Sequence, residues 1–282
     1  MKADLHVHTT ASDGCRSPTE VIQLAGDLGL QVIAITDHDS VQGIDAAMAA
    51  AKRIRSLKVI PGVEVSTDVP NGEVHILGYF LDHRDPYLAR RLQALRESRR
   101  VRAKRIIQKL ASLGMIISWE RVLELTDGGS IGRPHIARVM VERGYSPSIR
   151  DAFSSYIGRN GTAYVEREKL SPYEAIELVV RAHGVPVMAH PAEVEGLEKL
   201  VSQLREVGMV GIEVYYGSYT SPMVKRLADL ANKYELIPCG GSDYHGLDTI
   251  DRVPLGGVDI PEESLNRLFN LAKGRIKSKR HC

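Results

Sequence analysis

The amino-acid sequence predicts an α/β fold in which a mainly helical segment interrupts a regular alternation of strands and helices. Short apolar runs alternate with helical patterns at both ends of the chain, which favours a parallel sheet covered by helices. Six or seven such units suit a closed or nearly closed barrel better than an open sheet. The chain has 282 residues, of which 43% are hydrophobic and 26% charged, enough for a sizeable core. We expect residues 1–83 and 165–282 to form the barrel and residues 84–164 to form an insertion covering its mouth.

The predicted elements before residue 84 are short. Ser17 and Glu20 form a capping box, and Pro18 stands at the first helical position, so a helix is expected over Pro18–Leu28. The alanine-rich segment Gly43–Leu57 predicts a second helix. The strand-like runs of this part are Ala3–Val7, Gln31–Thr36, Lys58–Ser66 and Glu73–Phe80.

Helical patterns dominate from Pro86 to about Gly161, and strands then return. The helices expected in the middle segment are Pro86–Leu113, Ser118–Leu125, Pro134–Arg143 and Ser148–Ile157. The later strands are Val185–Ala189, Val210–Tyr216 and Leu236–Cys239, and the later helices are Pro172–His183, Val194–Val207 and Ser221–Tyr234. The tail Lys273–Arg280 is expected to be frayed and solvated.

Charge and cysteine content argue against several classes of protein. With 37 Lys and Arg against 35 Asp and Glu, the formal net charge is +2, so there is no global electrostatic case for nucleic acid or a membrane. No stretch approaches the roughly 18 apolar residues of a membrane span. The N-terminal segment contains Asp and His and does not resemble a signal peptide. Three cysteines without a CxxC pair indicate no disulfide framework and favour a reducing cytoplasm.

The helix near residues 84–109 is a local exception to this charge balance. It carries ten basic residues against two acidic ones. Such a face could attract RNA, although a solvated surface helix is the interpretation that we favour.

Histidine and carboxylate side chains gather where the predicted strands end. In a parallel α/β barrel the C-terminal strand ends converge on one face, where active sites form. A single histidine of this kind is usually a core or loop residue, but burying many imidazoles and carboxylates together is costly unless something pairs them. Such ligands suit Zn, Mn or Fe and need no thiolate. The candidate metal ligands are His6, His8, Asp13, His38, Glu64, His75, His190, Asp243 and His245.

The spacing within this set supports metal binding. His6 and His8 are two residues apart on an extended strand, so both side chains point to the same side. Asp243 and His245 repeat this spacing, and Asp13 follows five residues after His8. Nine ligands exceed what one ion needs, so two or three ions with a bridging carboxylate fit better.

Short motifs at the strand ends resemble those of the PHP (polymerase and histidinol phosphatase) family: DLHVHT…SDG, ITDHD, GVEVS, HILGY, AHP and GSDYH. The resemblance covers both ends of the chain, and the order of the nine ligands is complete. It implies a distorted (β/α)7 barrel. It also implies three groups of ligands, namely His6, His8, Glu64 and Asp243 for one ion, Glu64, His75 and His190 for a second, and Asp13, His38 and His245 for a third.

The helical insertion is similar to that of one branch of the family. Its GRPHIA motif stands here at residues 132–137, and its YIGR and AYV motifs stand at residues 156–159 and 163–165. Members of this branch look like 3′,5′-nucleoside bisphosphate phosphatases, and related members trim short RNA from the 5′ end. Arg133 precedes Pro134 at a predicted helix start, where free backbone N–H groups favour an anion. The residues expected to bind a substrate phosphate are Ser130, Arg133, His135 and Arg159.

The predicted chemistry is hydrolysis of a phosphate ester. Clustered divalent ions neutralise the transferring phosphoryl group and lower the pKa of bound water to about 7. The expected nucleophile is therefore a metal-bridging hydroxide, and no protein nucleophile is required. Asp37 and Asp39 flank His38 and either could orient it, although turn or cap chemistry accounts for them equally well. Glu213 could reach the site from its strand, and a structural role is equally open.

The main hypothesis is a metal-dependent phosphoesterase that removes the 3′-phosphate from nucleoside 3′,5′-bisphosphates to give nucleoside 5′-monophosphates, with some trimming of short RNA. One alternative is a phosphatase of a small metabolite such as histidinol phosphate. Another is a non-catalytic metal-binding module. The expected cofactors are two or three divalent ions, Mn²⁺, Fe²⁺ or Zn²⁺. The expected partner is a nucleotide or short phosphorylated oligonucleotide, with no membrane and no stable protein partner, in the cytoplasm.

Overall fold

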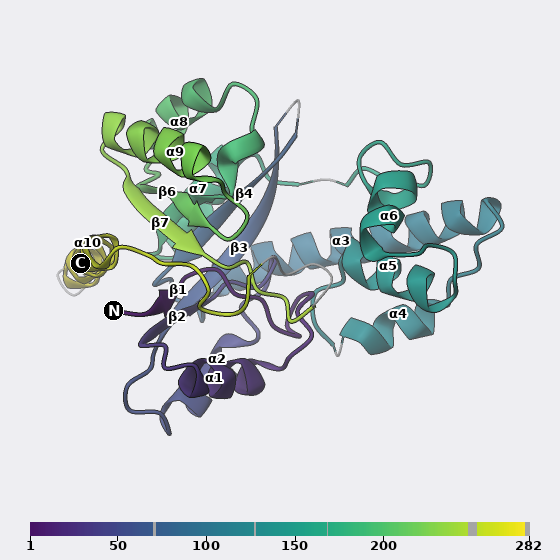
Figure 1. The fold of residues 1–282 in the computed structure, drawn as a ribbon, viewed down its shortest axis with the longest axis horizontal. Helices are drawn as coiled ribbons and strands as arrows, with labels where there is room; N and C mark the ends of the chain where they lie inside the picture. Colours follow the sequence, from purple (N-terminus) through teal and green to yellow (C-terminus); the bar gives the residue numbers. More distant parts are fainter. Residues whose placement is uncertain (70–71, 127, 168, 248–252, 280–282) are drawn as a thin grey trace.

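The computed structural model describes residues 1–69, 72–126, 128–167, 169–247 and 253–279. One sheet contains seven strands in chain order, which are β1 (Ala3–Asp4), β2 (Val32–Ile35), β3 (Lys58–Val69), β4 (Gly72–Tyr79), β5 (Val185–Ala189), β6 (Gly211–Tyr216) and β7 (Ile237–Gly241). Beyond β7, Tyr244 forms a parallel bridge with Val7, and the His8 N–H donates to the Tyr244 carbonyl at 2.9 Å. The sheet is therefore a nearly closed barrel, which confirms the predicted α/β class (Figure 1).

Strand β4 runs antiparallel to both of its neighbours, β3 and β5, while the other strand pairs are parallel. Strands β3 and β4 form a hairpin, and β3 extends to Val69, three residues beyond the predicted end. Because β4 runs in the opposite direction, its first half lies at the same end of the barrel as the last residues of the parallel strands. His75, in that first half, is paired in register with Ser66 and with Ala189.

Helices cover the barrel much as the sequence predicts. They are α1 (Pro18–Asp27), α2 (Ile44–Ala51), α7 (Pro172–Arg181), α8 (Leu197–Glu206) and α9 (Ser221–Lys233). The Ser17–Glu20 capping box is present at the start of α1. Helix α2 ends at Ala51, six residues before the predicted end. Strand β1 is shorter than predicted because side chains replace its ladder: the Asp4 carboxylate accepts from the His6 N–H, and the Thr36 hydroxyl accepts from the Val7 N–H.

The C-terminal residues form helix α10 (Glu262–Lys279), so the expectation of a frayed tail from residue 273 is wrong as far as residue 279. Leu265, Leu268 and Ala272 are buried in the apolar cluster that fills the inside of the barrel. The Phe269 ring lies 5.4 Å from the Phe80 ring, centroid to centroid. Helix α10 is therefore held by the burial of apolar side chains.

A helical lobe projects from the barrel (Figure 1). It contains α3 (Pro86–Ser112), α4 (Trp119–Thr126), α5 (Arg133–Glu142), α6 (Ile149–Ala152) and a π-helical turn (Phe153–Ile157). Residues from Ala103 to Ala163 form an apolar cluster of their own, whereas Leu88, Leu92 and Leu95 of α3 belong to a barrel cluster. We propose that residues 84–164 form one insertion, anchored through the first half of α3. Among the described residues, no helix has the length and apolar character needed to cross a membrane.

Candidate metal centre

All nine candidate ligands meet at one end of the barrel. Each strand except β6 supplies at least one of them, either from the strand itself or from the residues that follow it. Ligand atoms lie within 4.8 Å of one another in three groups, which are His6, His8, Glu64 and Asp243; His8, Asp13, His38 and His245; and His38, Glu64 and His75. The first group is the one that the family resemblance implies. The second adds His8, and in the third His38 takes the place expected for His190.

Glu64 is the centre of this cluster. Its Oε2 atom lies 3.3 Å from the Nε2 atoms of both His6 and His8 and 2.9 Å from His38 Nδ1. Its Oε1 atom lies 2.7 Å from His75 Nδ1 and 3.1 Å from His190 Nε2. One carboxylate therefore faces five imidazoles, as a bridging ligand would.

Two further carboxylates complete the cluster on either side of Glu64. Asp243 Oδ1 lies 3.0 Å from His8 Nε2 and 3.3 Å from His6 Nε2. Asp13 Oδ1 lies 3.5 Å from His245 Nε2. At these separations the carboxylate oxygens and imidazole nitrogens surround common positions that a cation could occupy.

The donor atoms fit metal binding. Several buried polar atoms of the cluster have no hydrogen-bond partner among the residues that the structure describes, namely His6 Nε2, His8 Nε2, His38 Nδ1, Asp13 Oδ1 and Glu64 Oε2. An unsatisfied buried polar atom costs roughly 1–3 kcal/mol, and native proteins keep few of them. Five such atoms aimed at one another are explained by cations between them, and imidazole with carboxylate suits divalent ions.

The carboxylates of the cluster are ionised, and imidazoles provide the balancing positive charge. Burial alone would raise the pKa of Glu64, but the surrounding histidines hold that pKa well below its usual range. Burial opposes protonation of His8, yet Asp243 and Glu64 raise the pKa of its ring to about 10. Burial lowers the pKa of His38 to about 4, which leaves that ring neutral. A divalent cation would take over the balancing role from the protonated rings.

Residues behind the ligands hold them in place. Glu213 on β6 is buried, approaches His6 Nδ1 to 3.2 Å and accepts from the His190 N–H at 2.7 Å. Asp37 accepts from the Thr9 N–H at 2.8 Å and from the Ser12 hydroxyl at 2.6 Å, so it positions the loop that carries Asp13. Of the two roles left open for Glu213, these contacts show that its side chain reaches the cluster and positions His6 and His190.

Asp39 serves a different part of the site from the one expected. It accepts from Arg99 Nε at 2.7 Å and from Arg167 Nη2 at 3.1 Å. The structure therefore shows neither Asp37 nor Asp39 bonded to His38 among the described contacts.

Three residues of the site have a left-handed backbone conformation. The φ angle is 50° at Asp39, 25° at His190 and 56° at Asp243. Non-glycine residues adopt such positive φ angles at an energetic cost, and these angles are common at functional sites.

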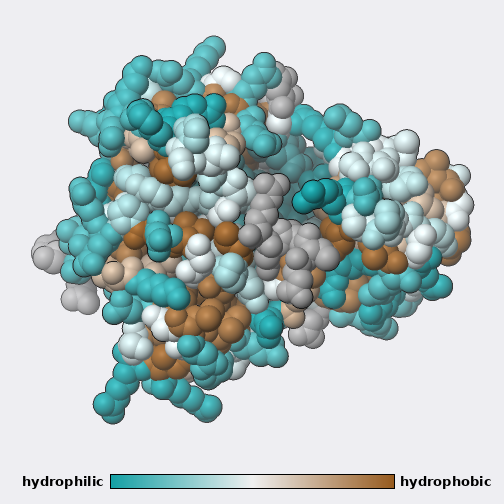
Figure 2. Space-filling model, in the orientation of Figure 1, coloured by the Kyte–Doolittle hydropathy of each residue, from teal (hydrophilic) through white to brown (hydrophobic). Residues whose placement is uncertain are grey.

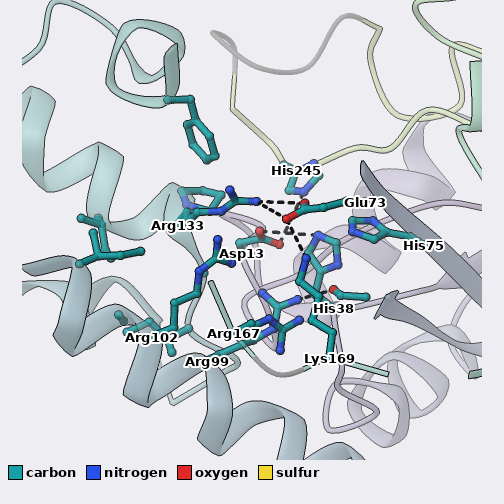
Figure 3. Close-up of a pocket in the computed structure, with 18 residues that line it drawn as sticks. Asp13, His38, Glu73, His75, Arg99, Arg102, Arg133, Arg167, Lys169 and His245 are labelled. Atoms are coloured by element: carbon teal, nitrogen blue, oxygen red, sulfur yellow. Dashed lines mark hydrogen bonds and ion pairs between the residues drawn. The ribbon is translucent and has the colours of Figure 1, made fainter. Parts of the chain in front are cut away.

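A cavity of about 190 Å³ lies between the helical lobe and the nine candidate ligands, the group that we call the metal cluster (Figure 3). Asp13, His38, His75 and His245 line it on the cluster side. We call it the cationic cavity, because five basic side chains also line it against Glu73, namely Arg99, Arg102, Arg133, Arg167 and Lys169. In the space-filling view, hydrophilic side chains border the recess between the barrel and the lobe (Figure 2).

Two of these arginines are buried and incompletely paired. Arg102 Nη2 and Arg167 Nε have no hydrogen-bond partner in the described part of the chain. Burial, together with neighbouring arginines, lowers the pKa of Arg102 and that of Arg167 to about 10. A bound anion would relieve this crowding of like charges and satisfy the free N–H groups.

Only one of the four residues expected to bind a substrate phosphate lines the cationic cavity. Arg133 does so from the first turn of α5. His135 is buried, and its Nδ1 accepts from the Gly132 N–H at 3.0 Å, so its side chain caps the N-terminus of α5. Ser130 is buried, and Arg159 is exposed; neither lines the cavity. Four further basic residues line the cavity without having been expected to bind phosphate, namely Arg99, Arg102, Arg167 and Lys169.

A second cavity, of about 480 Å³, lies on the other side of His245. Its metal-cluster residues are His190, Asp243 and His245. We call it the aromatic cavity, because Phe153, Tyr216 and Tyr219 also line it. The Tyr216 hydroxyl donates to Asp243 Oδ2 at 2.8 Å, so this wall of the cavity contacts the cluster directly.

Comparison with known proteins agrees with this site. The family model for the PHP domain matches residues 4–115. The 5′-3′ exoribonuclease Rnm of Salmonella typhimurium is 34% identical over 247 residues, which cover 86% of this chain and 84% of that protein. The 3′,5′-nucleoside bisphosphate phosphatase of Chromobacterium violaceum is also 34% identical, covering 86% of each chain.

Two further matches extend over nearly the whole chain. The phosphoribosyl 1,2-cyclic phosphate 1,2-diphosphodiesterase of Eggerthella lenta is 32% identical over 93% of this chain and 100% of that protein. A crystal structure described as a candidate metal-dependent phosphoesterase of Bifidobacterium adolescentis has a TM-score of 0.86 at 28% identity, covering 95% of this chain and 96% of the other. The chain belongs to the PHP-domain family of metal-dependent phosphoesterases.

Proposed function

We propose that the protein removes the 3′-phosphate from nucleoside 3′,5′-bisphosphates and leaves nucleoside 5′-monophosphates, with short 5′-phosphorylated RNA as a second substrate. The observation that carries this proposal is the cationic cavity beside the metal cluster. A phosphoryl group at the cluster and a second phosphate in that cavity would both be bound at once. The Salmonella typhimurium and Chromobacterium violaceum relatives bear names for these two activities.

We propose that all nine clustered residues are metal ligands, with Glu64 bridging. Divalent ions held there would neutralise the phosphoryl group and activate water at neutral pH. The residues behind the ligands fix their orientation: Glu213 sets His6, and Asp37 sets the loop of Asp13. The donor set contains imidazole and carboxylate without thiolate, so Mn²⁺, Fe²⁺ and Zn²⁺ are the ions that we propose. We propose a cytoplasmic enzyme.

The size of the cationic cavity suits a phosphate rather than a whole nucleoside. Its 190 Å³ lies below the roughly 300 Å³ at which pockets for larger ligands begin. Arginine forks bind phosphate oxygens in pairs, and Arg102 and Arg167 have N–H groups available for this. These features support an anion-binding role for the cavity.

The same cavity argues against the alternatives. Histidinol phosphate carries a protonated amine, which five basic side chains would repel. A non-catalytic module has no need of a cavity for a second anion. The phosphoribosyl cyclic phosphate named for the Eggerthella lenta relative does carry a further phosphate, so it is a second candidate substrate that the cavity favours.

Product analysis tests the proposal. Protein loaded with Mn²⁺ is incubated with adenosine 3′,5′-bisphosphate, and the nucleotides are separated by chromatography. We expect 5′-AMP and free phosphate, with slower turnover of 3′-AMP, which lacks the second phosphate. Parallel reactions contain histidinol phosphate, phosphoribosyl 1,2-cyclic phosphate and 5′-phosphorylated dinucleotide. Turnover of 3′-AMP as fast as that of the bisphosphate, or none of the bisphosphate by metal-loaded protein, would overturn the proposal.

A further inference from the structure

The cationic and aromatic cavities adjoin at the metal cluster. Pro134, Phe153 and His245 line both of them. The cationic cavity lies beside the ligands Asp13, His38 and His75, and the aromatic cavity lies beside His190 and Asp243. A molecule whose reacting phosphate sits at the cluster can therefore extend into both cavities.

The aromatic cavity differs from its neighbour in size and chemistry. Its volume of about 480 Å³ falls in the range of pockets for organic ligands, roughly 300–1,000 Å³. Phe153, Tyr216 and Tyr219 supply aromatic faces, and Ile149 and Met223 supply apolar surface. Aromatic side chains bind nucleobases of any sequence by stacking, because every base has a π-face.

From this arrangement we propose that the aromatic cavity binds the nucleobase of the nucleotide whose second phosphate occupies the cationic cavity. The inference rests on the proposed function. In a nucleoside 3′,5′-bisphosphate, one ribose carries both phosphates and the base. With one phosphate at the cluster and the other in the cationic cavity, the ribose lies at the rim that Pro134, Phe153 and His245 share. The base then extends into the aromatic cavity, which opens from the same rim.

Tyr219 is the aromatic residue that tests this inference best. Its hydroxyl accepts from the Ala192 N–H at 3.0 Å, and its ring centroid lies 4.9 Å from that of Tyr216. The ring is thus fixed in place, half-buried against the barrel core, while it also lines the cavity. Tyr216 is less suitable, because its hydroxyl bonds to the candidate ligand Asp243. Phe153 lies 5.4 Å from the Arg133 guanidinium, which belongs to the cationic cavity.

The experiment compares two substrates in the Mn²⁺-loaded protein. One is adenosine 3′,5′-bisphosphate, and the other is the abasic sugar bisphosphate, a tetrahydrofuran ring that carries the same two phosphates without a base. We expect wild-type protein to prefer the adenosine compound by about tenfold in kcat/KM, as the stacking of one base predicts. In Tyr219→Ala this preference should fall to about twofold. Tyr219→Phe, which keeps the ring, should retain most of it.

A matched control separates base binding from damage to the fold. Tyr173 is also a half-buried tyrosine packed against the same core, but it lines neither cavity. Tyr173→Ala should leave the substrate preference as in wild type. A 5′-phosphorylated dinucleotide provides a further arm, because it adds a nucleoside beyond the reacting phosphate.

The remaining outcomes overturn either the base site alone or the proposed function together with it. Equal turnover of the two bisphosphates by wild-type protein overturns the base site and leaves the proposed function intact. The base site is also overturned if Tyr219→Ala keeps the wild-type preference for the adenosine bisphosphate. If Tyr219→Ala impairs only the turnover of the dinucleotide, the aromatic cavity binds the nucleoside that follows the reacting phosphate instead. If metal-loaded wild-type protein hydrolyses neither bisphosphate, the proposed function itself fails, and this inference fails with it.

Discussion

Arg133 of the helical lobe is paired with Glu73 of the barrel. Arg133 Nη2 lies 3.2 Å and 3.1 Å from the two Glu73 carboxylate oxygens, and Lys169 Nζ lies 2.7 Å from Oε1 (Figure 3). Burial would raise the pKa of Glu73, but Arg133 and Lys169 hold that pKa well below its usual range. The cationic cavity thus already contains a carboxylate of the chain itself. A substrate phosphate that bound Arg133 would compete with Glu73.

Glu73→Gln should strengthen the binding of substrates with two phosphates. The amide keeps the shape of the side chain but removes the competing negative charge. We expect the KM for adenosine 3′,5′-bisphosphate to fall about threefold to tenfold, in line with the energy of a partly buried ion pair. The KM for 3′-AMP should change much less. Asp68→Asn is the control, because Asp68 also pairs with Lys169, at 2.9 Å, but does not line the cavity. An unchanged or higher KM for the bisphosphate would contradict this role of Glu73.

Arg133→Ala should reduce selectivity for the second phosphate. Removing a partly buried, charge-assisted contact to phosphate costs about 2–3 kcal/mol, or roughly 30- to 150-fold in kcat/KM for the bisphosphate. The loss for 3′-AMP should be several times smaller. Arg159→Ala is the comparison variant, because the structure places Arg159 outside both cavities. Equal losses for the two substrates in Arg133→Ala would show that Arg133 supports the fold rather than the second phosphate.

The gathering of the nine candidate ligands was predictable from the sequence because these residues interrupt apolar strands. A polar side chain at the end of a buried strand has few structural explanations, and His6, His38 and His190 each follow such a run. His75 is more instructive, since it lies inside β4 rather than at a strand end. The antiparallel direction of β4 brings it to the same end of the barrel. Strand direction is a property of the hairpin and is not visible in the residue types.

The cationic cavity was predicted only through Arg133. Leu88, Leu92, Leu95, Arg99, Arg102 and Ile106 follow one another at intervals of three or four residues, which is the spacing of a buried helix face. Arg99 and Arg102 therefore stand within the buried stripe of α3, whereas Arg100 and Arg105 are exposed. The interpretation of this helix as a solvated surface helix is right for Arg100 and Arg105 and wrong for Arg99 and Arg102. The spacing of three and four residues was the signal that could have identified Arg99 and Arg102 as inward-facing.

Arg167 and Lys169 could not be predicted in the same way. They lie between the lobe and α7, where no helical or strand period shows which side chains face inwards. Their positions depend on tertiary contacts, such as that between Arg167 Nη2 and Asp39. The aromatic cavity has the same origin, because Phe153 and Tyr219 come from separate parts of the chain and meet only in the folded protein.

Glu64→Gln should abolish both catalysis and stabilisation by metal. Glu64 approaches five imidazoles. The side-chain amide of the glutamine variant is uncharged, so it could not replace the negatively charged bridging carboxylate. In wild-type protein treated with a chelator, Mn²⁺ at 100 times its Kd should add about 2.7 kcal/mol to the free energy of unfolding. The variant should show little of this gain and at least a thousandfold lower kcat. Thermal unfolding with and without Mn²⁺ measures the first quantity. A full Mn²⁺ response in Glu64→Gln would refute the bridging assignment.

Glu213→Gln should weaken metal binding although it removes none of the nine candidate ligands. One Glu213 oxygen lies 3.2 Å from His6 Nδ1, and the other accepts from the His190 N–H. Glutamine has a single acceptor oxygen, so one of these two groups would face an NH2 group instead. Loss of such an orienting partner typically costs 10- to 100-fold in metal affinity, and about this loss is expected in a Mn²⁺ titration. Unfolding of the chelated variant controls for damage to the barrel, and wild-type affinity would exclude the orienting role.

His135→Gln should make stability less sensitive to acid. Burial lowers the pKa of His135 from 6.5 to about 4. Between these two pH values the unfolded chain binds a proton at this ring and the folded chain does not, so the wild type loses stability as the pH falls from 6.5 towards 4. Glutamine can still accept from the Gly132 N–H but does not titrate. From pH 7 to pH 5, chelated wild-type protein should lose about 2 kcal/mol more than the variant in urea unfolding. The other histidines are common to both proteins, so identical pH slopes would mean that the His135 ring has the same pKa in the folded and unfolded chains, which would contradict the lowered pKa.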